Sequence, residues 1–149
     1  MKPLIVLVIT FILAYLYTRF FLKKSNFKLA ARTALAVMLI FTAIGHFIFT
    51  KGMSVIIPNF IPLKKEIVLL TGVLEILLAV GILIPRFRVL FGWILVAFLI
   101  VVLPANIKAA LASIDYQTGQ FNGPSLQYLW FRIPLQVLFI IWTYFSTIK

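Results

Sequence analysis

The chain has 149 residues, of which 64% are hydrophobic and 11% carry a formal charge. Soluble proteins average roughly 45–50% apolar and about 25% charged residues, so this composition excludes a water-soluble domain of this length. The 14 basic and 3 acidic residues give a net charge of +11, and most basic residues stand in short links between apolar runs. That placement is typical of a membrane protein and argues against nucleic acid as a partner. The absence of cysteine excludes disulfides and thiolate metal sites.

The first apolar run covers residues 4–22 and is long enough to cross about 30 Å of hydrocarbon as a helix. A signal peptide is the competing interpretation, because Met1 and Lys2 begin a short basic region ahead of an apolar stretch. The run ends without a small-x-small cleavage site, and Lys23 and Lys24 follow it at once. We therefore predict a retained transmembrane helix within an N-terminal segment of residues 1–24.

Residues 29–149 predict a bundle of four further membrane helices. The apolar runs over 29–49, 63–84, 89–110 and 126–148 are each long enough to span the bilayer. Residues 50–63 are apolar but contain Pro58 and Pro62, so we expect a structured loop against the membrane surface. Residues 113–125 are the most polar part of the chain and predict an exposed loop. The predicted fold class is all-α: a four-helix transmembrane bundle with one extra N-terminal transmembrane helix.

The distribution of Lys and Arg predicts the orientation of the five helices. Links on one side of the membrane carry eight basic residues and those on the other side carry five. Cytoplasmic loops carry the excess of basic residues, so the first side is expected to be cytoplasmic. The N-terminus and the loops over 50–63 and 113–125 are then outside. The set expected in the cytoplasm is Arg19, Lys23, Lys24, Lys28, Arg32, Arg86, Arg88 and Lys149. The set expected outside is Lys2, Lys51, Lys64, Lys65 and Lys108.

Polar residues inside the apolar runs are the candidate functional residues. A charge near mid-membrane costs roughly 2.5–3.5 kcal/mol on insertion scales, so Glu75 is expected to face the bundle interior and to have a partner. Arg132, about two turns inside the last span, is the expected partner. The other candidates are Thr71 and Gln136, each one turn from one of these charges, and His46 and Asn106 near the outer helix ends. Together they predict a buried polar cluster that opens toward the outer side.

Each candidate also has a purely structural interpretation. Glu75 and Arg132 can hold two helices in register without any chemistry. His46 can cap a helix end or bond a loop carbonyl, and a lone His without a second His or any Cys predicts no metal or haem. Asn106 can satisfy backbone carbonyls that Pro104 leaves without a donor. The common nucleotide-binding, zinc-protease and serine-hydrolase motifs are missing from the sequence.

Several short motifs, taken in order, resemble the DoxX-like family of small bacterial membrane proteins. The resemblance extends from residue 29 to the C-terminus, and the order and spacing of the motifs carry it. They are Gly45-His46-Phe47, Ile57-Pro58, Ile61-Pro62, Thr71-Gly72-Val73-Leu74-Glu75-Ile76, Pro85-Arg86, Leu103-Pro104-Ala105-Asn106-Ile107 and Arg132-Ile133-Pro134-Leu135-Gln136. The resemblance implies a four-helix bundle in the bacterial plasma (inner) membrane, to which the first helix is an addition.

The same resemblance implies two functions. The family takes its name from a subunit of a thiosulfate–quinone oxidoreductase, so the first hypothesis is a redox-associated subunit that binds a quinone-like lipid. His46, Arg132 and Gln136 would hydrogen-bond a quinone oxygen, and Glu75 would accept or relay a proton. The alternative is a non-catalytic partner or assembly factor that holds another membrane protein through faces of small residues. A solute or proton pathway is least favoured, because the chain has no paired discontinuous helices.

Overall fold

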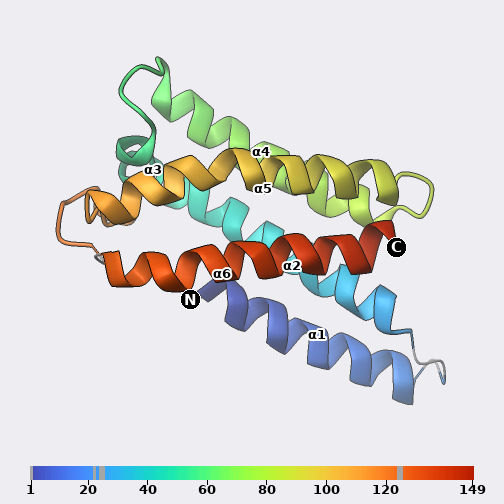
Figure 1. The fold of residues 1–149 in the computed structure, drawn as a ribbon. Coiled ribbons are helices and arrows are strands. Elements are labelled where there is room, and N and C mark those ends of the chain that lie inside the picture. The colour runs from blue at the N-terminus through green and yellow to red at the C-terminus, as the bar shows by residue number, and fades with distance from the viewer. Residues whose placement is uncertain (1, 22, 24–25, 124–125) are drawn as a thin grey trace.

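The structure is a computed structural model that describes residues 2–21, 23, 26–123 and 126–149, with only the backbone described for residues 126–128. These residues form an all-α bundle without a strand (Figure 1), which confirms the predicted fold class. Met1, Leu22, Lys24 and residues 124 and 125, which belong to segments predicted above, lie outside the described residues.

Five long helices make up the bundle. They are α1 (Lys2–Phe20), α2 (Phe27–Ile48), α4 (Lys64–Leu83), α5 (Arg88–Leu111) and α6 (Leu126–Thr143), which continues as the π-helical turn η1 (Tyr144–Ile148). Each of the five, the last counted from Leu129 to Ile148, is long and apolar enough to span a membrane. The helix bounds differ from the predicted apolar runs by at most two residues at either end.

The prediction of a loop over residues 50–63 is wrong in its first half. Residues Thr50–Ile56 form a short helix, α3, and only the residues after it run as a loop to α4. Ile57, the residue before Pro58, is extended, with φ −64° and ψ 136°. A proline disfavours the helical conformation in the residue before it, so Pro58 limits α3 at its end and leaves the preceding residues free to form a helix.

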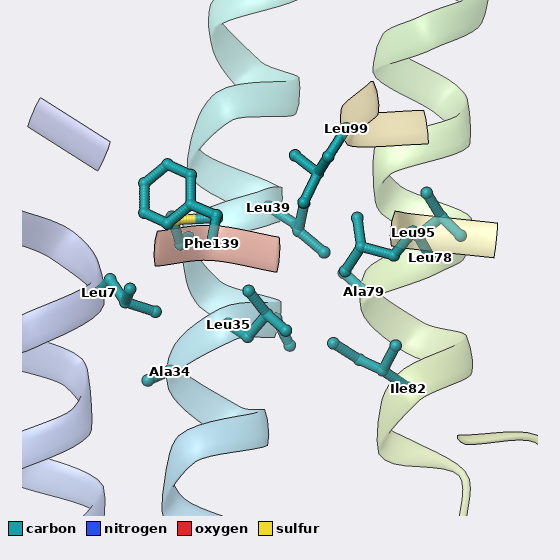
Figure 2. Close-up of a cluster of buried hydrophobic side chains, with 12 residues drawn as sticks. Leu7, Ala34, Leu35, Leu39, Leu78, Ala79, Ile82, Leu95, Leu99 and Phe139 are labelled. Atoms are coloured by element: carbon teal, nitrogen blue, oxygen red, sulfur yellow. The ribbon is translucent and has the colours of Figure 1, made fainter. Parts of the chain in front are cut away.

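An apolar core lies between the helices at about half their length (Figure 2). Leu35 and Leu39 of α2 face Leu78 of α4. Helices α1, α5 and α6 contribute Leu7, Leu95, Leu99 and Phe139. Small residues on α2 allow its neighbours to approach closely, and they are at most 4% exposed: Ala30, Ala31, Ala34, Ala36 and Ala43. The small-residue face of α2 is therefore buried within the chain itself.

Neighbouring helices run in opposite directions, so their links gather at two ends of the bundle (Figure 1). The end here named the α3 end carries α3, the loop between α3 and α4, and residues 112–123 between α5 and α6. The other end, named the C-terminal end, carries the link after α1, the turn between α4 and α5, and η1. This grouping matches the two sets of links from which the orientation is predicted.

The short helix α3 is fixed to its neighbours at the α3 end. Lys108, near the end of α5, donates from Nζ to the carbonyls of Ile57 (2.7 Å) and Val55 (3.3 Å), and so satisfies the last turn of α3. A Cβ on Gly52 would overlap the carbonyl of Tyr116, so only glycine allows residues 112–123 to lie directly on α3. The predicted exposed loop is therefore anchored, with Ile114 buried beneath it.

Candidate functional site

The carboxylate of Glu75 lies against the ring of His46, in the contact between α4 and α2. Glu75 is only 7% exposed. Its Oε1 atom is 3.6 Å from Nε2 of His46, which is an ion-pair distance and longer than a hydrogen bond. Two candidate residues from different helices are thus brought together, and they join α2 to α4 through polar groups.

The second ring nitrogen of His46 meets two groups of α4. Nδ1 lies 3.0 Å from Oγ1 of Thr71 and 3.2 Å from the carbonyl of Val68. The Thr71 hydroxyl donates its single hydrogen to the same carbonyl at 2.8 Å. A carbonyl only accepts, and the Thr71 oxygen then also accepts, so both neighbours require Nδ1 to carry a hydrogen.

With its hydrogen on Nδ1, the ring turns its other nitrogen, Nε2, toward Oε1 of Glu75 at 3.6 Å. The two side chains meet there at ion-pair distance, without a hydrogen bond between them.

The second carboxylate oxygen of Glu75 lacks a hydrogen-bond donor among the described residues. Oε2 is buried and accepts no hydrogen bond from the described part of the chain. A buried acceptor left without a donor costs roughly 1–3 kcal/mol. A buried polar atom of this kind calls for a water or a ligand that donates to it. Oε2 is the point at which the site is open to a further hydrogen-bond donor.

Gly72 sets the close approach of the two helices at this site. A Cβ on Gly72 would lie 3.0 Å from Cβ of His46 and 3.3 Å from the Phe47 ring. Thr71 stands about two turns after the start of α4, whereas His46 stands less than one turn before the end of α2. Helix α4 therefore extends beyond α2 at the α3 end. This offset lets Glu75, midway along its own helix, reach a residue near the end of α2.

A second polar contact links α5 to α6. Nδ2 of Asn106 donates to Oε1 of Gln136 at 3.5 Å, the long limit of a hydrogen bond, and Nε2 of Gln136 donates to the carbonyl of Leu99 at 2.7 Å. Gln136 is 8% exposed. Pro104 leaves the carbonyl of Ile100, and not that of Leu99, without its helical donor. The two bonds therefore join α5 to α6 through side-chain amides, and the interpretation that Asn106 satisfies carbonyls freed by Pro104 stays a prediction.

The two polar contacts lie at a similar level in the bundle. Glu75 stands three residues before Leu78, and Gln136 stands three residues before Phe139, and both of these apolar residues belong to the core. Each polar side chain is therefore one turn from the core on the side of the α3 end. We name His46, Thr71, Glu75, Asn106 and Gln136 the polar layer. Arg132 lies one turn beyond Gln136 on α6, half-buried, and its contact with Glu75 stays a prediction.

The sequence pattern missed one contributor to this site and one contact that holds α3. The Val68 carbonyl orients His46, but a backbone acceptor on a regular helix leaves no mark in the sequence. Lys108 appeared only as a charge in the topology count, although its position four residues after Pro104 placed it near the end of a helix. Among the described residues, groups of three or more His, Asp and Glu side chains that could hold a metal are absent.

The fold and the polar layer define the class: a multi-pass helical membrane protein with a buried glutamate against a half-buried histidine. The chain belongs to the family of the domain of unknown function DUF8561, whose model matches residues 35–147. The match begins within α2 and reaches η1, so it includes every residue of the polar layer. No curated protein and no solved structure matches the chain.

Proposed function

We propose that this protein binds the head group of a quinone-like lipid at the polar layer, as a subunit associated with membrane redox chemistry. The observation that carries the proposal is the buried Oε2 atom of Glu75, which has no donor among the described residues. A quinol carries two hydroxyl groups, and one of them would donate to this oxygen. The motifs that resemble the DoxX-like family support the same ligand class.

The His46–Glu75 pair would give the bound head group a place to leave a proton. Oxidation of a quinol releases two protons and two electrons. The carboxylate would accept one proton through its hydrogen bond, and the other would leave to water at the outer side. The electrons would pass to a partner redox subunit, because this chain offers no thiol that could take them. The chain would then supply binding and proton exchange, and the partner the electron transfer.

The proposed location is the bacterial plasma (inner) membrane, with the C-terminal end in the cytoplasm. The excess of Lys and Arg in the links of that end supports this orientation. The polar layer would then lie in the outer half of the bilayer, since it is displaced from the core toward the α3 end. A quinone head group resides among the lipids and would reach this level from the side of the bundle.

The alternative function is a non-catalytic partner or assembly factor for another membrane protein. That hypothesis depended on faces of small residues, and the structure buries those of α2, together with Gly72 and Ala79 of α4, inside the chain. A partner would have to dock elsewhere, for example on the exposed apolar faces of α1 and α5. No particular contact in the structure favours this alternative over quinone binding.

The test is a binding titration with a short-tailed quinol, combined with mass spectrometry of what the protein retains after gentle solubilisation. The native protein is expected to retain a quinone and to bind the added quinol saturably. Glu75→Gln is expected to weaken binding about tenfold or more, because a charge-assisted hydrogen bond is replaced by a neutral one. Thr33→Val is the matched control, because Thr33 bonds only its own helix at the Leu29 carbonyl. A native protein that neither retains nor binds quinol contradicts the proposal.

A further inference from the structure

The charges of the molecule are segregated between its two ends. The chain has only three acidic residues, and all of them lie toward the α3 end. Glu66 is in the first turn of α4, Asp115 is in the segment after α5, and Glu75 turns toward His46 near the end of α2. The C-terminal end therefore has a cluster of Lys and Arg side chains without any acidic side chain to neutralise it.

One cation of this cluster is buried. Arg32, in the second turn of α2, is only 9% exposed. Among the described residues its guanidinium makes one hydrogen bond, from Nε to the Lys28 carbonyl at 3.3 Å. Arg88, at the start of α5, stands one turn before Gly92, which packs against Thr147 of η1, and Lys28 of α2 also reaches η1. A buried charge requires an opposite charge or a full set of hydrogen bonds, and this end of the molecule supplies no acidic side chain.

We propose that Arg32, Arg88 and Lys28 form a binding site for the phosphate group of an anionic phospholipid. The guanidinium of Arg32 keeps its terminal nitrogens for the planar fork that matches two phosphate oxygens. Lys28 stands one turn before Arg32 on the same face of α2. Its Nζ atom already donates to the main-chain oxygen of Lys149 at 3.0 Å, so the ammonium group is directed toward the end of η1. A phosphate among these groups would supply the opposite charge that the buried Arg32 requires.

A groove beside this cluster explains why the ligand is a lipid and not free phosphate. The groove has a volume of about 270 Å³ and runs between α2 and α6. Phe27 and Ala31, on either side of Lys28 in the sequence, form one wall. The other wall is almost wholly apolar and includes Trp142, whose ring Nε1 donates to the Ala31 carbonyl at 3.1 Å. An acyl chain fits such a groove, with its phosphate held at the mouth.

The test uses Trp142 as a reporter in the whole protein. A variant with Trp93→Phe and Trp130→Phe leaves Trp142 as the single tryptophan. The delipidated protein in detergent is titrated with short-chain phosphatidylglycerol, and in parallel with phosphatidylcholine of the same chain length. We expect a saturable change in Trp142 fluorescence with phosphatidylglycerol. We expect at least about tenfold weaker binding of phosphatidylcholine, whose choline cation the cluster repels.

Arg32→Gln is expected to weaken phosphatidylglycerol binding about tenfold or more, because it removes the guanidinium group that would bond two phosphate oxygens. The matched control is Arg86→Gln, which removes a cation at the same end that lies exposed over the Phe87 ring at 5.8 Å. Its effect is expected to be less than about twofold. If Arg32→Gln does not fold, Arg88→Gln serves in its place with the same expected loss.

Three results would overturn the lipid site. In the first, Arg86→Gln weakens binding as much as the variant at Arg32 or Arg88, which indicates an unspecific surface charge effect. In the second, phosphatidylcholine binds as tightly as phosphatidylglycerol. In the third, inorganic phosphate at equal concentration displaces the lipid, which indicates a site for the free ion. The site is at the C-terminal end, so its failure leaves the quinone proposal untouched.

Discussion

A carboxylate inside a helical bundle is stable only when its neighbours supply a charge or hydrogen-bond donors. Glu75 obtains part of this from His46, whose orientation is determined by Thr71 and the Val68 carbonyl. Three groups on two successive turns of α4 therefore act on one ring from α2. Two of them are acceptors for Nδ1, so the ring turns Nε2 toward the carboxylate.

The first prediction is that His46 and Glu75 are energetically coupled. His46→Gln or Glu75→Gln alone leaves the remaining partner without its counterpart, and breaking a buried ion pair typically costs about 3–5 kcal/mol. The double variant is expected to lose about 1–3 kcal/mol less than the sum of the two single losses. The measurement is the free energy of unfolding in detergent for all four proteins.

Two further cycles make this result specific. Glu75→Gln combined with Thr33→Val is expected to be additive within about 0.5 kcal/mol, because the two sites are distant. Glu75→Gln combined with Arg132→Gln tests the partner expected from sequence alone. Additive losses for His46 and Glu75 would show that the two side chains do not interact, and would remove the basis for the proposed proton acceptor.

At the scale of whole elements, the offset between α2 and α4 creates the site. The extra turns of α4 at the α3 end place Val68, Thr71 and Glu75 alongside the last turns of α2. Gly72 faces the same side and allows the backbones to come close. The site therefore depends on how two helices slide along each other as much as on the residues they carry.

The second prediction concerns this helix contact. Gly72→Ala adds a Cβ at 3.0 Å from His46 Cβ, so α2 must shift, and overpacking of this kind typically costs about 1–3 kcal/mol. Gly45→Ala is the matched control, because its nearest neighbour is Met53 Cε at 3.7 Å, which is ordinary contact. In a helix Ala is favoured over Gly by up to about 1 kcal/mol, so the control is expected to be neutral or stabilising. Thermal unfolding distinguishes them, and equal stability of the two variants would contradict the close contact.

The third prediction concerns α3, which has seven residues and depends on its neighbours to remain helical. Lys108→Met keeps the length of the side chain but removes the donor to the carbonyls of Val55 and Ile57. Backbone amides of α3 are expected to exchange with deuterium about tenfold faster, because losing a charge-assisted bond of about 1.5–3 kcal/mol promotes local opening. Lys51→Met, an exposed change within α3, is the control. Unchanged exchange in Lys108→Met would show that packing alone holds α3.

For the whole molecule, the decisive question is which end faces the cytoplasm. The structure groups the links into two ends, and the Lys and Arg count predicts that the C-terminal end is cytoplasmic. The chain has no cysteine, so single cysteines can report the side of each link. The structure also directs the choice of sites: Ser146 is 4% exposed and would not react whichever side it faced.

The fourth prediction is that the α3 end is outside. Cysteines at Asn59 and Gln120, which are exposed at the α3 end, are expected to react with an impermeant thiol reagent in intact cells. Cysteines at Phe21 and Phe87, exposed at the C-terminal end, are expected to react only after the membrane is opened. None of these four changes alters the charge that sets the orientation. Labelling of Phe21→Cys in intact cells would reverse the assignment.

The sequence by itself determined the class of protein and the positions of its helices. A helix needs about 20 apolar residues to cross the hydrocarbon, and a charge within it is costly. The hydropathy pattern of the sequence therefore shows the helix bounds and marks Glu75 as an exception. The sequence also assigned the charged links to two sets. Helices that cross a bilayer in succession must alternate in direction, so successive links lie on opposite sides. These properties follow from each segment's own contact with the lipid.

Only the tertiary structure decided which polar groups meet. Counting residues places each side chain along its own helix, but the relative offset of two helices depends on packing at Gly72 and on the short helix α3. That offset brought His46 to Glu75, and the packing of the other helices gave Gln136 a carbonyl of α5 and buried Arg32. Contacts between helices depend on shape at the interface, and a hydropathy pattern carries no information about shape.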